Sequence, residues 1–131
     1  MTRSFATKGF SEEQKSIYDI VLNAQVKSID GIKAGISCRS IDNIARSYIE
    51  QAGYGKFFDH GLGHSLGLEI HEDPRFSKVS KDILKENYVM TVEPGIYVKD
   101  IGGVRIEDDI IVTNDGAEIL NQTSKEFQVI S

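Results

Sequence analysis

Three short stretches of the sequence concentrate the side chains that could do chemistry. All three histidines, His60, His64 and His71, fall within twelve residues that also contain several glycines. Glu93 follows in the sequence Val-Glu-Pro-Gly, and Glu107 stands in Gly-Val-Arg-Ile-Glu-Asp. Both glutamates lie among apolar residues, where burying a carboxylate is costly unless it is hydrogen bonded or binds a cation. The three stretches therefore indicate a metal site.

The last stretch has the alternating pattern of a β-strand over residues 104–113. Because successive side chains of a strand point to opposite faces, Arg105, Glu107 and Asp109 would share one face. Glu107 is then a candidate metal ligand, with Arg105 tuning the charge around it. A plain Arg–Glu pair on a solvated sheet face would give the same pattern and contribute little.

The histidine stretch does not have the composition of a helix. His60 and His64 are four residues apart, the spacing of a helical metal pair, but Gly61 and Gly63 disfavour a helix there. Glycines instead indicate that the backbone closely approaches another segment or a ligand. A thermolysin-like zinc site is excluded because the sequence has no His-Glu-x-x-His motif. A structural histidine is the alternative interpretation of each imidazole.

The donor types point to a particular chemistry. One imidazole together with two carboxylates, those of Glu93 and Glu107, is an oxygen-rich donor set that suits manganese, cobalt, iron or zinc rather than a structural zinc held by thiolates. Two such ions bridged by a carboxylate could activate a water and hold the carbonyl oxygen that it attacks, which is the logic of two-metal hydrolysis. For Glu93, a simple acid at the edge of a turn remains the alternative.

The elements that must position these residues are two helices followed by strands. Ser11 and Gln14 form a capping-box pattern, which predicts a helix that ends near Gly31. Apolar residues at helical spacing predict a second helix from a cap at Ser40 to a stop at Gly53. Strands are predicted over residues 88–92, 96–98, 104–113 and 117–120, with turns at 73–74, 102–103 and 114–116. This order predicts an α+β domain with both helices on one face of a sheet.

Composition excludes several classes of protein. The 131 residues fit one domain, and the net charge of −5 argues against a nucleic-acid or anionic-membrane surface. No apolar run approaches the length of a membrane span. The single cysteine, Cys38, cannot form an internal disulfide, so we expect a cytoplasmic protein. A catalytic Cys38 is not expected, because it precedes a helix start and has no histidine beside it.

Residues 60–71, 91–97 and 103–109 resemble, in this order, motifs of the Xaa-Pro dipeptidase and Xaa-Pro aminopeptidase family. The likeness extends over nearly the whole chain, including residues 18–35 and 41–55. That family shares the pita-bread fold of creatinase and methionine aminopeptidase. The resemblance therefore implies two helices packed on a curved, mainly antiparallel sheet, and a reaction that hydrolyses the Xaa-Pro bond of dipeptides or short peptides.

The resemblance also assigns roles to six residues. Three look like ligands of two divalent metal ions, with the last bridging them: His64, Glu93 and Glu107. His60 and His71 look like the histidines that bind substrate, handle protons and stabilise the tetrahedral intermediate. Arg105 looks like the catalytic-site arginine that stands beside the bridging glutamate. Manganese is the first expectation for the metal, with cobalt or zinc as alternatives. We expect the three ligands to converge within coordination distance, and the other histidines to line the same concavity.

The chain departs from the family pattern at its start. The family uses five protein ligands, and two of them are aspartates that precede the motifs found here. The opening residues 1–4 resemble the stretch Ser-Asp-x-Thr-Arg after its aspartate. Residues 1–131 are therefore interpreted as a single partial catalytic domain, the C-terminal half of a pita-bread fold without its N-terminal half. Alone, the chain should bind metal weakly, show negligible activity and self-associate as a homodimer through its uncovered sheet edge.

A second function remains open at this point. Pita-bread domains without metal ligands also serve as peptide- or protein-binding modules, so the chain could be a non-catalytic scaffold. The retention of His64, Glu93 and Glu107 favours the peptidase, because a scaffold has no need of buried carboxylates.

Overall fold

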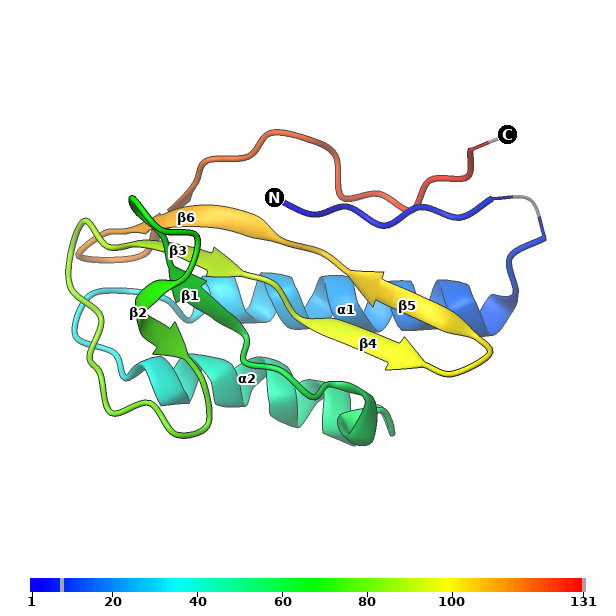
Figure 1. The fold of residues 1–131 in the computed structure, drawn as a ribbon, viewed down its shortest axis with the longest axis horizontal. Coiled ribbons are helices and arrows are strands. Elements are labelled where there is room, and N and C mark those ends of the chain that lie inside the picture. Colours follow the sequence, from blue (N-terminus) through cyan, green and yellow to red (C-terminus); the bar gives the residue numbers. More distant parts are fainter. Residues whose placement is uncertain (8, 131) are drawn as a thin grey trace.

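A computed structural model describes residues 1–7 and 9–130. The helices and strands follow one another as α1 (Glu12–Asp30), α2 (Cys38–Gln51), the 3-10 helix η1 (Gly55–Phe57), β1 (Gly63–Ser65), β2 (Glu72–Phe76), β3 (Val89–Val92), β4 (Gly95–Val98), β5 (Gly102–Arg105), β6 (Asp108–Val112) and β7 (Ala117–Ile119). Figure 1 shows the two long helices side by side, with the strands packed against them and β4, β5 and β6 running nearly along α1. None of the described helices is both long enough and apolar enough to span a membrane.

The strands form one main sheet and one hairpin. The five-stranded sheet has the order β2-β1-β3-β6-β7, and every neighbouring pair in it is antiparallel. β4 and β5 pair separately as an antiparallel hairpin. This arrangement of two helices against antiparallel strands confirms the predicted α+β class.

The first helix begins and ends as its sequence predicts. The Ser11 hydroxyl accepts a hydrogen bond from the Gln14 amide, and the Gln14 side chain accepts one from the Ser11 amide. The helix stops at Gly31, whose amide bonds to the preceding turn. Local capping chemistry is sufficient to set both ends of this helix.

The second helix begins earlier than predicted. Its N-cap is Ser37 rather than Ser40, and Cys38 is its first helical residue rather than the residue before it. The reason is a contact far along the chain, because Ser37 forms a β-bridge with Ile83 and stays extended up to that point. The apolar stripe itself is correct, since Ile41 and Ile49 are fully buried.

Several strand predictions need correction. The predicted single strand over residues 104–113 divides into β5 and β6, because Glu107 pairs through its backbone with Thr2 instead of continuing the hairpin. The glycines at 102 and 103 belong to β5 rather than to a turn. Residues 73 and 74, predicted as a turn, lie inside β2, and the histidine stretch contributes the unpredicted β1. The turn at 114–116 and the returning strand β7 are confirmed.

The core lies between the helices and the sheet. It contains fully buried apolar side chains from both layers, among them Ile17, Val21, Ile41, Ile49, Met90, Val92, Ile96 and Ile110. One carboxylate, Asp108, is equally buried and is held by Arg3 at 2.6 Å, Lys125 at 2.9 Å and Gln25 at 3.1 Å. Burial raises the pKa of Asp108, but hydrogen bonds and charges from Lys125 and Arg3 outweigh it, and the net direction is downward.

This buried network joins four parts of the chain that are distant in sequence. Arg3 belongs to the N-terminal segment, Gln25 to α1, Asp108 to β6 and Lys125 to the C-terminal segment. The two terminal segments run side by side in Figure 1, and their backbones pair at Ala6 and Val129. Arg3 also donates to the carbonyl of Glu107 at 2.7 Å, so the network fixes the backbone of a predicted ligand.

Candidate active site

His64 occupies the middle of β1, and its backbone and ring are both fixed. Its amide donates to the Thr91 hydroxyl at 3.0 Å, which ties β1 to β3. Its Nδ1 lies 3.0 Å from the carbonyl oxygen of Ser65. A carbonyl can only accept, so Nδ1 carries the proton and Nε2 of the neutral ring has an unshared lone pair. Metal-binding histidines commonly use this arrangement to orient the ligating nitrogen.

Glu93 faces that nitrogen from the end of β3. Oε1 of Glu93 lies 3.1 Å from Nε2 of His64, and it also accepts the Thr91 hydroxyl at 2.8 Å. Two lone pairs at this distance repel each other unless a cation or a proton lies between them. The side chains are only 13% and 16% exposed, so water screens this repulsion poorly. The pair is therefore arranged for a metal ion or for an imidazolium–carboxylate pair.

Glu107 lies on the face that strand alternation predicts. Arg105, Glu107 and Asp109 line one cavity of about 470 Å³, whereas Asp108 is buried on the opposite side. The Glu107 carboxylate accepts a hydrogen bond from the Thr2 hydroxyl, and the Met1 amino group lies 3.6 Å away. The shared face is confirmed, and the solvated-surface interpretation is wrong because Glu107 is only 15% exposed.

The three predicted ligands do not form one closed cluster. Within residues 1–7 and 9–130, no three histidine, cysteine, aspartate or glutamate side chains lie together closely enough to hold an ion. His64 and Glu93 lie in contact, as expected, and the convergence of Glu107 with them remains a prediction.

The other two histidines flank this pair. The His71 ring packs edge-on against the His64 ring, with 4.5 Å between centroids. His60 donates from Nδ1 to the carbonyl of Gly61 at 2.8 Å, and its Nε2 lies 2.9 Å from the Tyr97 hydroxyl. Because Nδ1 carries the proton, Nε2 of the neutral ring accepts from Tyr97.

Two adjoining cavities bring the six predicted residues together. A cavity of about 430 Å³ and the cavity of about 470 Å³ share four lining residues: His64, His71, Glu93 and Arg105. His60 lines the first cavity and Glu107 lines the second. These volumes lie within the usual range for small-molecule sites. The predicted concavity therefore exists, and the roles assigned to its residues remain predictions.

Glycines make this packing possible. A Cβ atom at Gly63 would lie 2.0 Å from the carbonyl oxygen of Thr91, and one at Gly61 would lie 2.7 Å from that of Phe76. Neither backbone oxygen can move without breaking the sheet around it. The predicted close approach of another chain segment is confirmed at both positions.

The sequence does not reveal two polar residues of the site. Thr91 bridges His64 and Glu93, and Tyr97 contacts His60. Burial raises the pKa of Tyr97, and the nearby Arg105 offsets part of that effect, so the phenol stays protonated and can donate at neutral pH. Threonine and tyrosine in apolar strands are typical β-formers, and no spacing signal distinguishes these two.

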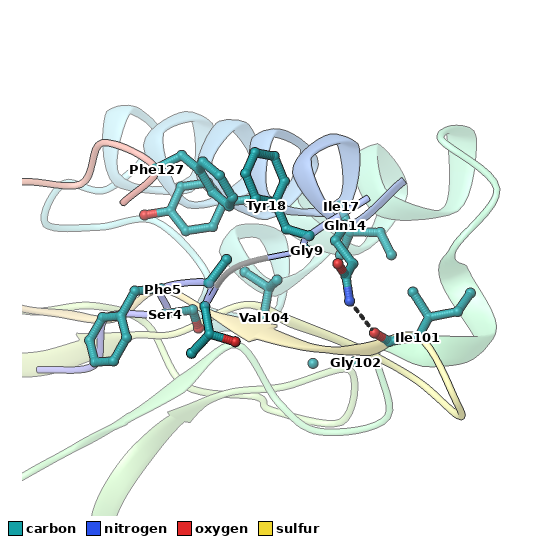
Figure 2. Close-up of a pocket in the computed structure, with 14 residues that line it drawn as sticks. Ser4, Phe5, Gly9, Gln14, Ile17, Tyr18, Ile101, Gly102, Val104 and Phe127 are labelled. Atoms are coloured by element: carbon teal, nitrogen blue, oxygen red, sulfur yellow. Dashed lines mark hydrogen bonds between the residues drawn. The ribbon is translucent and has the colours of Figure 1, made fainter. Parts of the chain in front are cut away.

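A third cavity, of about 290 Å³, shares no lining residue with the other two. Figure 2 shows it between the N-terminal segment, α1 and the β4–β5 hairpin, where Gln14 donates to the carbonyl of Ile101 at 2.6 Å. Its described lining contains no imidazole or carboxylate. It offers no donor set for a metal within the described residues.

Comparisons with known proteins agree with the motifs. Residues 1–114 match metallopeptidase family M24. The chain is 48% identical over 127 residues to an Xaa-Pro dipeptidase from Pyrococcus horikoshii, covering 97% of this chain and 36% of that protein. A solved Xaa-Pro dipeptidase from Bacillus anthracis is 48% identical, with a TM-score of 0.96 over 98% of this chain and 36% of the other. An X-Pro aminopeptidase structure from Thermotoga maritima is 43% identical, with a TM-score of 0.88 over 92% and 34%.

These matches define the fold and the family together. The chain spans 36% of the length of the dipeptidases that it matches. Over that span the structures agree closely, which confirms the predicted pita-bread architecture of two helices on an antiparallel sheet. By its sequence motifs, its fold and these comparisons, the chain belongs to metallopeptidase family M24.

Proposed function

We propose that residues 1–131 form part of the catalytic domain of a metal-dependent peptidase that hydrolyses the Xaa-Pro bond of dipeptides or short peptides. The single observation that carries this proposal is the 3.1 Å contact between Nε2 of His64 and Oε1 of Glu93. With a neutral imidazole, each atom presents a lone pair to the other, at the border of two cavities that the remaining predicted residues line. This geometry favours a bound cation.

The donor chemistry fits a divalent metal. His64, Glu93 and Glu107 would hold it, with manganese as the first choice and cobalt or zinc as alternatives. When bound, the metal supplies a water that deprotonates near neutral pH and a Lewis acid for the carbonyl oxygen. Thr91 then orients both His64 and Glu93, because its hydroxyl accepts from one residue and donates to the other.

The other residues of the cavities have proposed roles toward the peptide. His60 and His71 would bind the substrate and handle protons on the tetrahedral intermediate. Tyr97 orients His60, because its hydroxyl donates to Nε2. Arg105 places a positive charge on the cavity wall that Glu93 and Glu107 also line. There it would stabilise the negative charge that develops on the carbonyl oxygen of the substrate.

The chain supplies three of the five donors that the family resemblance implies. We therefore propose that residues 1–131 are one half of the catalytic domain, that they bind metal weakly alone, and that they do not turn over substrate alone. Steady release of proline from an Xaa-Pro dipeptide by the pure chain would contradict this part of the proposal.

A chimaera tests the proposed function directly. The matching 127-residue segment of the Pyrococcus horikoshii dipeptidase would be replaced by the corresponding residues of this chain. We expect the chimaera to cleave an Xaa-Pro dipeptide, and His64→Ala to lower kcat/KM by roughly a hundredfold or more, since even residues that only orient a ligand contribute 10- to 100-fold. Glu118→Gln, on exposed β7, is the matched control. A folded chimaera that binds the dipeptide without cleaving it would favour a binding module.

We also propose that the chain self-associates as a homodimer in the cytoplasm. Large apolar side chains are exposed on several segments: Phe5, Leu68, Ile70, Val79, Val129 and Ile130. A stable interface should bury well over about 1,000 Å² in total. Sedimentation velocity at micromolar concentration should show a dimer, and a stable monomer would refute self-association. A buried thiol, Cys38, is compatible with a reducing compartment.

A further inference from the structure

Helix α2 carries a buried ion pair that faces the loop of residues 58–62, which contains His60. The Arg46 guanidinium donates to both carboxylate oxygens of Asp42, at 2.8 and 3.0 Å. The Asp42 side chain is 1% exposed and that of Arg46 is 13% exposed. On α1, Lys15 and Asp19 have the same spacing, but both are about half exposed, as is usual for such pairs.

The remaining bonds of the pair go to the backbone on both sides of His60. Arg46 donates to the carbonyl of Phe58 at 3.0 Å and to the carbonyl of His60 at 2.9 Å. The amide of Leu62 donates to Asp42 at 3.0 Å. Three alternate residues of one loop are therefore bonded to two side chains on the helix.

Aromatic contacts extend the arrangement to the His60 ring. The Arg46 guanidinium lies 4.3 Å from the centroid of the Phe58 ring, and that ring packs edge-on against His60 at 5.0 Å. Nδ1 of His60 donates to the carbonyl of Gly61, which leaves Nε2 for the Tyr97 hydroxyl. The direction of Nε2 thus depends on where the backbone of residues 58–62 is held.

Stability alone does not explain this pair. A buried ion pair can often be replaced by apolar residues of similar volume with no loss of stability. Apolar side chains at 42 and 46 could fill the core, but they could not bond to the carbonyls of Phe58 and His60 or to the amide of Leu62. The polar pair therefore provides a fixed loop position that an apolar pair cannot provide.

We propose that Asp42 and Arg46 are positioning residues for His60, holding its loop so that the ring lines the cavity with Nε2 directed toward the Tyr97 hydroxyl. Neither residue lines the two active-site cavities. This proposal rests on the proposed function for one point only, which is the reason why His60 must be held in place. The position itself can be measured without metal or substrate.

The test is side-chain NMR of the three histidines in the full, metal-free chain. Long-range nitrogen–proton correlations report the tautomer of each ring. The main variant is Asp42→Leu combined with Arg46→Met, which replaces the ion pair by apolar side chains of similar volume. The second variant, Arg46→Lys, keeps the positive charge beside Asp42 but removes the planar guanidinium that donates several hydrogen bonds at once. Asp19→Asn, in the exposed pair on α1, is the matched control.

We expect His60 to change from one dominant tautomer, protonated at Nδ1, to a mixture in both variants, while the signals of His64 and His71 stay in place. The double variant should still fold, with a thermal midpoint below that of the wild-type chain because three backbone groups lose their hydrogen-bond partners. Wild-type His60 signals in either folded variant would overturn the proposal, even if stability fell. Equal changes in all three histidines, or unfolding of both variants, would assign the pair to general stability and would also overturn it. A chain that binds no metal would contradict the proposed function. The NMR result would still test the positioning of His60, because it is measured without metal.

Discussion

The hydroxyl of Thr91 donates to Oε1 of Glu93 at 2.8 Å and thereby fixes the carboxylate that faces His64. The same hydroxyl accepts the amide of His64 at 3.0 Å. One buried side chain thus connects the two residues that are proposed to hold a metal. A hydroxyl can accept one bond while it donates another, so Thr91 links the Glu93 carboxylate to the backbone of His64 across β1 and β3.

Replacing Thr91 by valine should weaken metal binding. Valine keeps the shape and β-propensity of threonine but removes the bond to Glu93. Residues that orient a metal ligand typically contribute 10- to 100-fold in affinity, so a loss of about this size is expected for Mn²⁺. Thr91→Ser retains the hydroxyl and should restore most of the affinity. Equal Mn²⁺ affinities for Thr91→Val and the wild-type chain would show that the bond from Thr91 to Glu93 does not contribute to metal binding.

Replacing Gly63 by alanine should destabilise the fold. The new Cβ would lie 2.0 Å from the carbonyl oxygen of Thr91, so β1 and β3 would have to separate. We expect the free energy of unfolding to fall by at least about 2 kcal/mol, measured by chemical denaturation. At Gly116, where the nearest atom to an added Cβ is 3.8 Å away, the same replacement should change it by less than about 0.5 kcal/mol. Similar values at the two positions would contradict the close-packing explanation.

The thiol of Cys38 should be unreactive in the folded chain. Burial, and then the charge of Asp82, raise the pKa of Cys38 from 9.0 to about 11. A chromogenic disulfide reagent at pH 8 should therefore label the native chain slowly and the denatured chain completely. Rapid stoichiometric labelling of the native chain would contradict the buried position.

The same shift has a consequence for stability at alkaline pH. The unfolded thiol ionises near 9.0, whereas the folded thiol stays protonated until about 11. Its contribution to stability is therefore fully present below pH 9 and is lost as the pH rises toward 11. The free energy of unfolding should fall across this window in the wild-type chain and fall less steeply in Cys38→Ala. Parallel pH profiles for the two chains would contradict the assignment.

Features set by neighbouring residues were predictable from the sequence. The capping box of Ser11 and Gln14 and the stop at Gly31 act within one helical turn, so they define α1 without any other part of the chain. Strand alternation likewise placed Arg105 and Glu107 on one face before any pairing was known. In both cases the controlling contacts are local.

Features set by distant partners were not predictable. The start of α2 depends on the pairing of Ser37 with Ile83, and the break between β5 and β6 depends on the pairing of Glu107 with Thr2. The Thr2 hydroxyl that engages the Glu107 carboxylate is 105 residues away in sequence. No pattern within one segment contains such contacts, so the bond between Thr2 and the Glu107 carboxylate could not be foreseen.

At the candidate site, the residue types were predictable from the sequence, whereas the contacts between segments were not. Residue types and motif order pointed to His64 and Glu93, which the structure places in contact. The supporting residues Thr91, Tyr97 and Arg46 gave no signal, because each acts on the backbone or side chain of another segment. Such residues look like ordinary strand or helix residues until the fold brings their partners near.

Titration of the 131-residue chain with Mn²⁺, followed by water-proton relaxation, tests the central claim most directly. The account predicts weak but measurable binding by the wild-type chain. Binding should be lost in His64→Ala and in Glu93→Gln, because each removes one of the two facing donors, and it should be unchanged in the exposed control Glu118→Gln. A wild-type chain that does not bind Mn²⁺, or a His64→Ala chain that binds it as the wild type does, would contradict a metal site at His64 and Glu93.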